Sequence, residues 1–167
     1  MTSHEVEYKI EKLNISHTLL DFDCGDENVN EYFNQRSYEE VELGNAQIYV
    51  FILVNTNDLI GFYTLSMKSV RFNYEGREYD QPVCLLGQIG VNKIFQNKGW
   101  GTILIKDAKK RCKKISEDIG SIGLLLETYK EELVNGFFKK LGFEYVEHHK
   151  MKNRGTRYRL FCKHEHE

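Results

Sequence analysis

The feature that most constrains the fold is an apolar segment, a glycine-bearing loop and an amphipathic segment in direct succession, between residues 83 and 119. The apolar run from Val83 to Val91 has the length of a buried strand. From about Gly99 to Ile119, apolar residues recur at helical spacing. This order leaves a row of backbone N–H groups at the positive end of the helix dipole. The sequence therefore predicts an anion site in the loop residues Gln96, Asn97, Lys98, Gly99, Trp100, Gly101 and Thr102.

The residues of the loop limit which kind of anion it can bind. A Cβ atom at Gly99 or Gly101 would hold a bulky phosphate away from the backbone donors, and Thr102 can add a hydroxyl. The loop lacks the ending of a Walker A motif, and it lacks the glycine triplet and ribose-binding carboxylate of dinucleotide folds. A pyrophosphate site is one interpretation, and an ordinary helix N-terminus is the alternative.

The remaining periodicities predict a mixed α/β chain that forms a single domain over residues 1–167. Asp26 is a plausible N-cap for a helix to about Tyr38, and Asn and Asp residues between two β-rich runs favour a tight turn. Gly120 stands where a helix-ending glycine belongs. Strands are expected at Val6–Leu13, Ala46–Val54, Leu59–Val70, Ile122–Leu126, Phe143–Glu147 and Tyr158–Cys162, and a further helix at about Glu131–Lys140.

Charge limits the partners of the chain. The formal net charge of -2 argues against a protein held to nucleic acid by bulk attraction. The charge is nevertheless uneven, because residues 1–45 are strongly acidic and one region holds a surplus of about seven positive charges. That basic region comprises Lys93, Lys98, Lys106, Lys109, Lys110, Arg111, Lys113 and Lys114, opposed locally by Asp107.

Cysteines and hydropathy indicate the compartment. The four cysteines are scattered without a C-x-x-C pair, which fits free thiols. The chain shows neither an apolar signal core nor an apolar run long enough to span a membrane, so a cytoplasmic protein without membrane contact is expected. No metal site is expected, because His148 and His149 would point to opposite faces of a strand and the histidines of the tail lie at a solvated end.

Two motifs together resemble the GNAT (Gcn5-related N-acetyltransferase) superfamily. The loop matches its Gln/Arg-x-x-Gly-x-Gly/Ala signature. The segment Phe137-Phe138-Lys139-Lys140-Leu141-Gly142-Phe143 is similar to its aromatic pair followed by Leu-Gly-Phe. The resemblance implies a mostly antiparallel central sheet of about six to seven strands flanked by helices, with a splayed strand pair at the coenzyme site.

The resemblance also implies acetyl-CoA as co-substrate and a primary amine as acceptor. Main-chain groups of Ile89, Gly90 and Val91 would bind the pantetheine arm, and residues Gln96 to Thr102 would bind the pyrophosphate. Phe138 is assigned to the coenzyme site. Gly90 is the position at which a bulge would sit in the strand. The acceptor is a small molecule or a macromolecule, and a homodimer is the commonest closed assembly for such a chain.

A further likeness lies in the N-terminal half. The segments Phe22-Asp23-Cys24-Gly25, Val29-Asn30-Glu31-Tyr32-Phe33 and Ile60-Gly61-Phe62-Tyr63-Thr64-Leu65-Ser66 resemble GNAT-type toxins of toxin-antitoxin modules, which acetylate the amino group of aminoacyl-tRNA. A tRNA-acetylating toxin is therefore an alternative to an acetyltransferase of unknown acceptor.

Catalysis requires a deprotonated amine, a donor to the thioester oxygen and a proton source for the thiolate. By resemblance, the backbone N–H of Val91 is the oxyanion donor. Glu127, at the end of an apolar strand, is the candidate general base. The family's usual proton donor is a tyrosine where this chain has Phe138, so Tyr129, solvent, or loss of catalysis in a coenzyme-binding regulatory module remain open.

Overall fold

The computed structural model describes residues 6–14, 17 and 21–164. Its contacts divide the chain into two compact units. Unit 1 comprises Met1–Thr64 and Gln88–Leu104, and unit 2 comprises Leu65–Gly87 and Ile105–Glu167. Seven strands form one sheet in the order β1-β2-β3-β4-β5-β7-β6. The chain is thus a mixed α/β protein, as the sequence predicts.

Unit 1 begins with a strand, a helical segment and a hairpin. Asp26 caps the first helix, since its side chain accepts from the N–H groups of Asn28 at 3.0 Å and Val29 at 3.4 Å. The helical segment continues past the predicted end near Tyr38. It consists of two α-helices joined by a π-helical turn. The elements are β1 (Tyr8–Lys12), α1 (Glu27–Glu31), the π-helix Tyr32–Arg36, α2 (Ser37–Glu42), β2 (Gln47–Leu53) and the first half of β3 (Leu59–Arg71).

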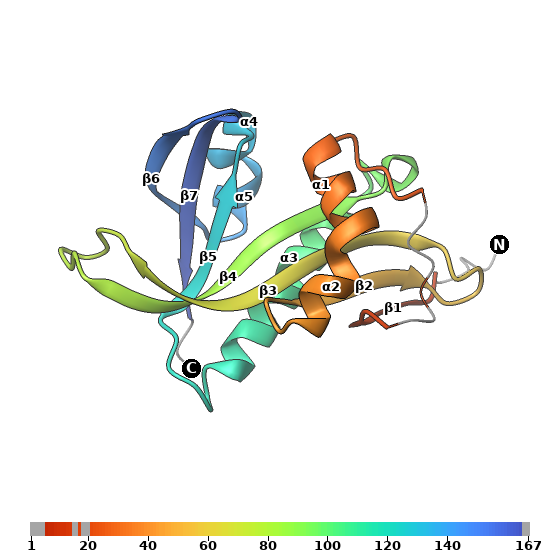
Figure 1. Ribbon diagram of the computed structural model, residues 1–167, viewed down its shortest axis with the longest axis horizontal. Helices are drawn as coiled ribbons and strands as arrows, with labels where there is room; N and C mark the ends of the chain where they lie inside the picture. Colours follow the sequence, from red (N-terminus) through yellow and green to blue (C-terminus); the bar gives the residue numbers. More distant parts are fainter. Residues whose placement is uncertain (1–5, 15–16, 18–20, 165–167) are drawn as a thin grey trace. The chain divides into compact units, whose positions relative to one another are not determined.

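The core of unit 1 lies between this helical segment and the strands β2 and β3 (Figure 1). Phe33 is fully buried, with its ring centroid 4.3 Å from that of Phe62 and 4.9 Å from that of Phe22. The predicted tight turn between the two strands is present, and Asn57 adopts a positive φ of 60° there. Packing of these aromatic rings fixes the segment around Phe22 against the sheet.

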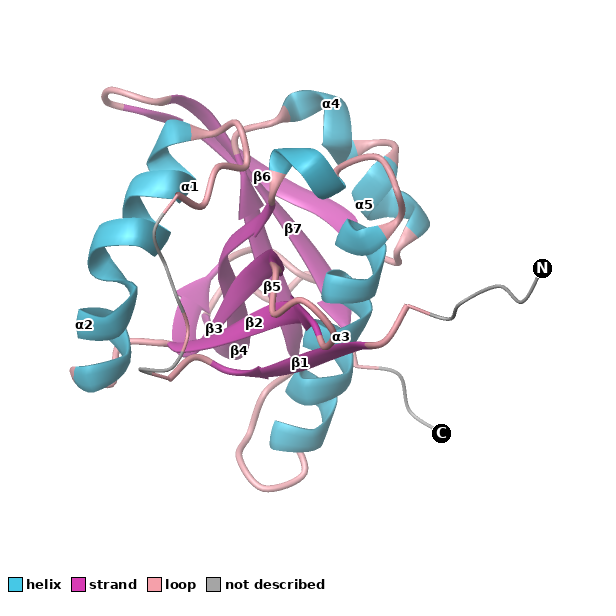
Figure 2. Ribbon diagram, turned by 90° about the vertical axis from the view of Figure 1, so that its right-hand side faces the viewer, coloured by secondary structure: helices cyan, strands magenta, loops and turns pink. Residues whose placement is uncertain are grey.

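Unit 2 is built on β5 and the hairpin of β6 and β7. β5 (Gly123–Thr128) pairs in parallel with β4 (Asp80–Val91) and antiparallel with β7 (Gly155–Lys163), which pairs with β6 (Glu144–Met151). The short helices α4 (Glu131–Val134) and α5 (Phe137–Lys140) lie against β7 and β6 respectively (Figures 1 and 2). One continuous helix was expected here, and Gly136 interrupts it.

Helix α3 (Trp100–Ile115) contributes its first turn to unit 1 and the rest to unit 2. It ends before the predicted boundary at Ile119, and Gly120 does not act as its cap. Ser116 donates its hydroxyl to the carbonyl of Lys113, and the acidic Glu117 and Asp118 would stand unfavourably at the negative end of the helix dipole. These residues explain the earlier end of the helix.

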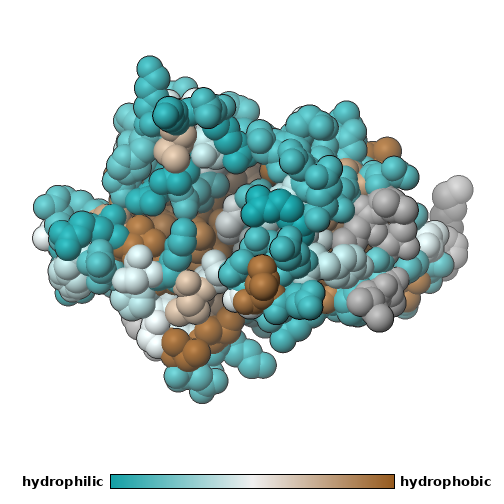
Figure 3. Space-filling model, in the orientation of Figure 1, coloured by the Kyte–Doolittle hydropathy of each residue, from teal (hydrophilic) through white to brown (hydrophobic). Residues whose placement is uncertain are grey.

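Hydrophilic residues cover most of the face shown in Figure 3. Among the described residues, no helix is both long and apolar enough to cross a membrane.

Candidate functional site

The predicted anion loop joins β4 to α3 within unit 1. After Val91 the chain makes a 3₁₀ turn over Lys93–Phe95 and enters α3 at Trp100. Asn97 and Gly99 both adopt positive φ, at 63° and 85°. A Cβ atom built at Gly99 would meet no atom within 4 Å. The positive φ of Gly99 therefore favours glycine at this position, and the absence of a side chain leaves open space beside the loop.

The helix N-terminus exposes backbone donors. The N–H groups of Trp100, Gly101 and Thr102 belong to the first turn, where the helix offers no acceptor. The first bond that closes onto the loop runs from the N–H of Ile103 to the carbonyl of Gly99, at 3.4 Å. The dipole adds partial positive charge at the same end. This is the arrangement that binds phosphate groups at helix N-termini.

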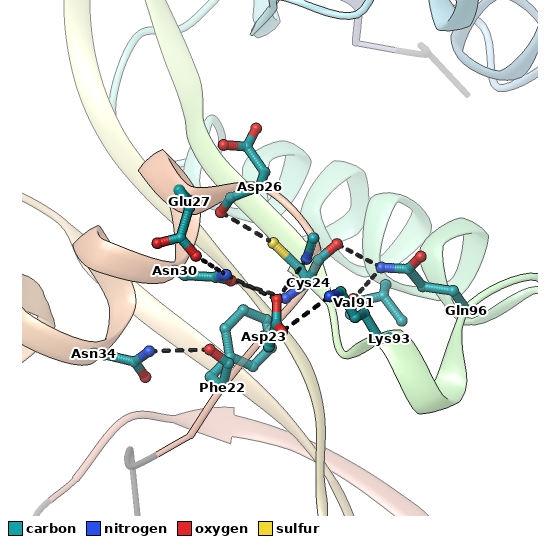
Figure 4. A network of polar contacts seen from close by, with 11 residues as sticks. Phe22, Asp23, Cys24, Asp26, Glu27, Asn30, Asn34, Val91, Lys93 and Gln96 are labelled. Carbon is teal, nitrogen blue, oxygen red and sulfur yellow. Dashed lines mark hydrogen bonds and ion pairs between the residues drawn. The ribbon is translucent and has the colours of Figure 1, made fainter.

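Gln96, the first residue of the loop signature, points its side chain into the protein. Its Nε2 donates to the carbonyls of Cys24 at 2.7 Å and Val91 at 2.8 Å (Figure 4). Both carbonyls are thereby satisfied, which matters because an unpaired buried carbonyl is costly. The Gln96 side chain thus ties the segment around Cys24 to the end of β4, a contact that the sequence pattern did not predict.

The Phe22–Gly25 segment is held by a polar network within unit 1 (Figure 4). The Asp23 carboxylate accepts from the N–H of Gly25 and from Asn30 Nδ2, both at 2.9 Å, and lies 3.1 Å from Lys93 Nζ. These groups, the Gly25 N–H foremost, lower the pKa of Asp23 below its usual value. Asn30 also accepts from the N–H of Cys24 at 2.8 Å. The network fixes the shape of the segment that carries the toxin-like pattern.

Gly90 is closely packed against the 22–29 segment. A Cβ atom built there would lie 3.2 Å from atoms of Cys24, Phe22 and Val29. Gly61 on β3 approaches even more closely, because its Cβ would come within 2.5 Å of the carbonyl oxygen of Gly90. Gly90 therefore lets the 22–29 segment pack closely on β4, and Gly61 lets β3 approach β4.

Trp100 anchors the start of α3. Its ring centroid lies 5.3 Å from that of Phe51 and 5.9 Å from that of Tyr8, both in edge-to-face geometry. Its indole Nε1 is buried and makes no hydrogen bond within the described part of the chain. Trp100 is one of the predicted anion-loop residues, and these distances give direct support to a packing role.

Glu127 lies at the end of β5 in unit 2, beside two arginines of β7. Its Oε2 is 2.6 Å from Arg157 Nε and 3.7 Å from Arg159 Nε. Arg159 also reaches Glu147 at 3.2 Å. The register pairs Glu127 with Arg159, so both side chains share one face of the sheet. The candidate base is therefore part of an ion-pair network, which the sequence analysis missed although Arg157 and Arg159 stand two residues apart on one strand.

The two candidate aromatic residues of unit 2 differ in setting. Tyr129 follows β5, and the guanidinium carbon of Arg154 lies 4.0 Å from its ring centroid, a cation–π contact. Phe138 is 4% exposed and packs edge to face with Phe137 and Phe143, at 5.2 and 6.1 Å. The hydroxyl of Tyr129 is thus carried on a ring that Arg154 holds in place.

The two units carry opposite charge. Unit 1 has 5 Lys and Arg residues against 12 Asp and Glu, a formal charge of -7, and unit 2 has 18 against 13, a formal charge of +5. The net charge of -2 that argued against a nucleic-acid partner is the sum of these two values. No group of three or more His, Cys, Asp or Glu side chains among the described residues is placed to hold a metal ion.

Comparison with known proteins identifies relatives. The model of the acetyltransferase (GNAT) family matches residues 14–143. A "tRNA-acetylating toxin" of Mycobacterium tuberculosis is 26% identical over 132 residues, which span 75% of this chain and 78% of the relative.

Solved structures share the fold. AtaT complexed with acetyl-methionyl-tRNA superimposes with a TM-score of 0.79 at 22% identity, covering 94% of this chain and 95% of AtaT. A tyrosine-to-phenylalanine variant of AtaT, bound to the C-terminus of the antitoxin AtaR and to acetyl-CoA, gives 0.72 at 25% identity, covering 91% and 92%.

Proposed function

Since the chain belongs to the acetyltransferase (GNAT) family, we propose that it transfers an acetyl group from acetyl-CoA to the amino group of an aminoacyl-tRNA. The observation that carries the proposal is the likeness, over most of the chain, to a protein named as a tRNA-acetylating toxin. The Phe22–Gly25 segment supports it from within the chain, because a dedicated hydrogen-bond network builds it.

The charge of unit 2 supports an RNA substrate. Its formal charge of +5 comes with basic side chains on the β6–β7 hairpin, among them Lys150, Lys152 and Arg154. Phosphate contacts by Lys and Arg supply much of the affinity of proteins for nucleic acid, and local charge governs them more than the sum over the chain. The acidic residues of unit 1 therefore do not argue against this acceptor.

The residues of the β4–α3 loop fit the pyrophosphate of a coenzyme. The open space at Gly99 and the backbone donors of the first turn of α3 are the features such a group requires. Lys98 adds an exposed positive charge to the same loop. Acetyl-CoA supplies the acetyl group as a reactive thioester.

Backbone and side-chain groups of this protein would supply the rest of the catalytic chemistry. By family resemblance, the N–H of Val91 polarises the thioester carbonyl, and we assign the proton for the departing thiolate to Tyr129. Glu127 remains the candidate base for the attacking amine. Its contact with Arg157 favours a second role, in which the carboxylate positions the arginine and the arginine meets the acceptor.

A non-catalytic coenzyme-binding module is the second candidate, because Phe138 lacks the hydroxyl that the family places there. One experiment separates the two. The protein is incubated with acetyl-CoA and with charged tRNA, the same tRNA without its amino acid, or free amines, and released thiol is counted. Thiol release with charged tRNA alone is the expected result. Equal release with free amines would point to a small acceptor, and coenzyme binding without release would point to the module.

A further inference from the structure

We propose that a basic cavity in unit 2 is a binding site for the diphosphate group of a small molecule. The cavity has a volume of about 210 Å³ and is lined by residues of α3, of β5 and of the end of β7. All of these residues belong to unit 2, whereas the β4–α3 loop belongs to unit 1. The site is therefore built separately from the one that we assign to acetyl-CoA.

The wall of the cavity carries charge of one sign. Among the described residues, no acidic side chain lines it. Asp107, the one acidic residue of α3, lies 2.8 Å from Arg111 Nε and is thus engaged by another cation. The basic side chains that line the cavity are Lys109, Lys110, Lys113, Lys163 and His164.

The number of positive charges indicates the class of ligand. A cleft whose walls carry one sign of charge concentrates the electrostatic potential inside it and attracts ions of the opposite sign. Four lysines around one hollow favour an anion with several negative charges over chloride or a single carboxylate. Lysine binds phosphate groups as a point charge with three donors, so a diphosphate matches this lining.

The fold holds part of the lining in place without a ligand. Lys109 Nζ donates to the carbonyl of Leu141 at 2.9 Å, which uses one of its three N–H groups. A Cβ atom built at Gly142 would lie 3.3 Å from the same Nζ, so the glycine gives the ammonium room. His164 Nε2 lies 3.2 Å from Ser121 Oγ. Groups that are ordered before binding lose less entropy when the ligand arrives.

The apolar part of the lining strengthens the attraction and limits the size of the ligand. Leu124 and Cys162 are 2% and 8% exposed. Charges interact more strongly beside such a surface than in bulk water. The volume is below the roughly 300–1,000 Å³ of sites for drug-sized ligands, which favours a compact group.

The empty cavity has an energetic cost that a bound anion would offset. Lys109 and Lys113 stand four residues apart on α3, and like charges at this spacing destabilise a helix. An anion that binds the folded chain neutralises this repulsion and stabilises the fold by mass action. The melting temperature should therefore rise with pyrophosphate at constant ionic strength.

Isothermal titration calorimetry with inorganic pyrophosphate tests the site on the whole chain carrying Gly99→Glu, which blocks the β4–α3 loop. Neither acetyl-CoA nor RNA is present, so the result does not depend on the proposed acetyl transfer. We expect a single pyrophosphate to bind, and NMR spectra of the ¹⁵N-labelled protein to shift most at residues of the lining, Leu124 and Lys163 among them. A parallel titration with ADP shows whether a nucleotide or the free anion binds more tightly.

Two matched pairs of substitutions, both made in the Gly99→Glu chain, separate direct contact from general attraction. Lys110→Gln combined with Lys113→Gln removes two charges from the wall and keeps good helix formers. Pyrophosphate affinity should fall roughly tenfold or more, because hydrogen bonds to charged groups are lost. Lys106→Gln combined with Lys114→Gln makes the same change at exposed positions of α3 outside the lining and should leave affinity unchanged.

Three results would overturn the proposal. The first is the absence of binding by millimolar pyrophosphate and ADP to protein whose circular dichroism shows it to be folded. The second is an equal loss of affinity from both lysine pairs, which would reduce the effect to the overall charge of α3. The third is weaker binding of tRNA by Lys110→Gln with Lys113→Gln when neither diphosphate binds, which would assign these lysines to RNA.

Discussion

Unit 1 and unit 2 handle charge in opposite ways. In unit 1 an acidic residue near the loop has a structural role, since Asp23 binds Gly25, Asn30 and Lys93. In unit 2, acidic side chains hold arginines in place, as Glu127 does for Arg157, while lysines at the hairpin tip face solvent. A net charge averages over both arrangements, so the partners of such a chain have to be inferred from each unit separately.

The loop of unit 1 provides the largest expected effect. Gly99→Glu places a negative charge and a side chain where a pyrophosphate would lie, so acetyl-CoA affinity should fall by roughly a hundredfold or more, equivalent to about 2.8 kcal/mol. Isothermal titration calorimetry measures this loss.

The matched control is Gly44→Glu, also in unit 1, with a φ of 77° against 85° and likewise no atom within 4 Å of the added Cβ. It carries the same backbone strain at a different place and should bind acetyl-CoA normally. Equal affinity of both variants and the wild type would refute the loop assignment.

Unit 2 supplies the candidate proton donor. Tyr129→Phe removes the hydroxyl but keeps a ring under Arg154, so kcat should drop by roughly a hundredfold while KM changes little. Tyr158→Phe is the control, since it deletes a hydroxyl from the same unit. Steady-state thiol release measures both. If Tyr129→Phe is silent and Phe138→Tyr raises the rate, the donor position is Phe138 and the natural chain lacks it.

Reversing the charge of selected lysines tests whether the charge difference between the two units matters for RNA binding. Lys150→Glu combined with Lys152→Glu should raise KM for charged tRNA about tenfold and reduce the salt dependence of binding by about 0.7 to 0.9 in logarithmic slope per lost phosphate contact. Lys9→Glu combined with Lys12→Glu makes the same charge change in unit 1 and should have little effect. A similar loss from both pairs would mean that overall charge, and not the hairpin, controls RNA affinity.

Local patterns predicted the parts of the molecule that depend on neighbours in sequence. The Asp26 cap, the hairpin turn at Asn57 and the strand-loop-helix around Gly99 all follow from residues within a few positions. The contact of the Gln96 side chain could not be predicted in this way, because it joins Gln96 to Cys24, which is 72 residues away. The bulge expected at Gly90 stays a prediction, and its close contact with Phe22, Cys24 and Val29 is a feature that the local pattern did not predict. Such contacts depend on which elements meet in space, and no periodicity encodes that.

The smallest expected effect is a change in the free energy of unfolding, and it concerns the polar network around Asp23 in unit 1. Since the folded pKa of Asp23 lies below its usual 3.8, its charged form stabilises the fold above that value, and this contribution is lost as the pH falls through the lowered pKa. Asp23→Asn should therefore be less stable than the wild type near pH 6, and the difference should shrink toward pH 2, as urea unfolding at several pH values would measure.

Lys93→Ala removes one of the three contacts that lower the Asp23 pKa, and not the largest, so it should give the same trend with a smaller amplitude. Asp23 is largely exposed, and screening by water keeps the whole effect modest. The difference in stability between Asp23→Asn and the wild type could instead stay constant from pH 6 to pH 2. The charge of Asp23 would then have no part in holding the Phe22–Gly25 segment, and the side chain would act through its shape and hydrogen bonds alone.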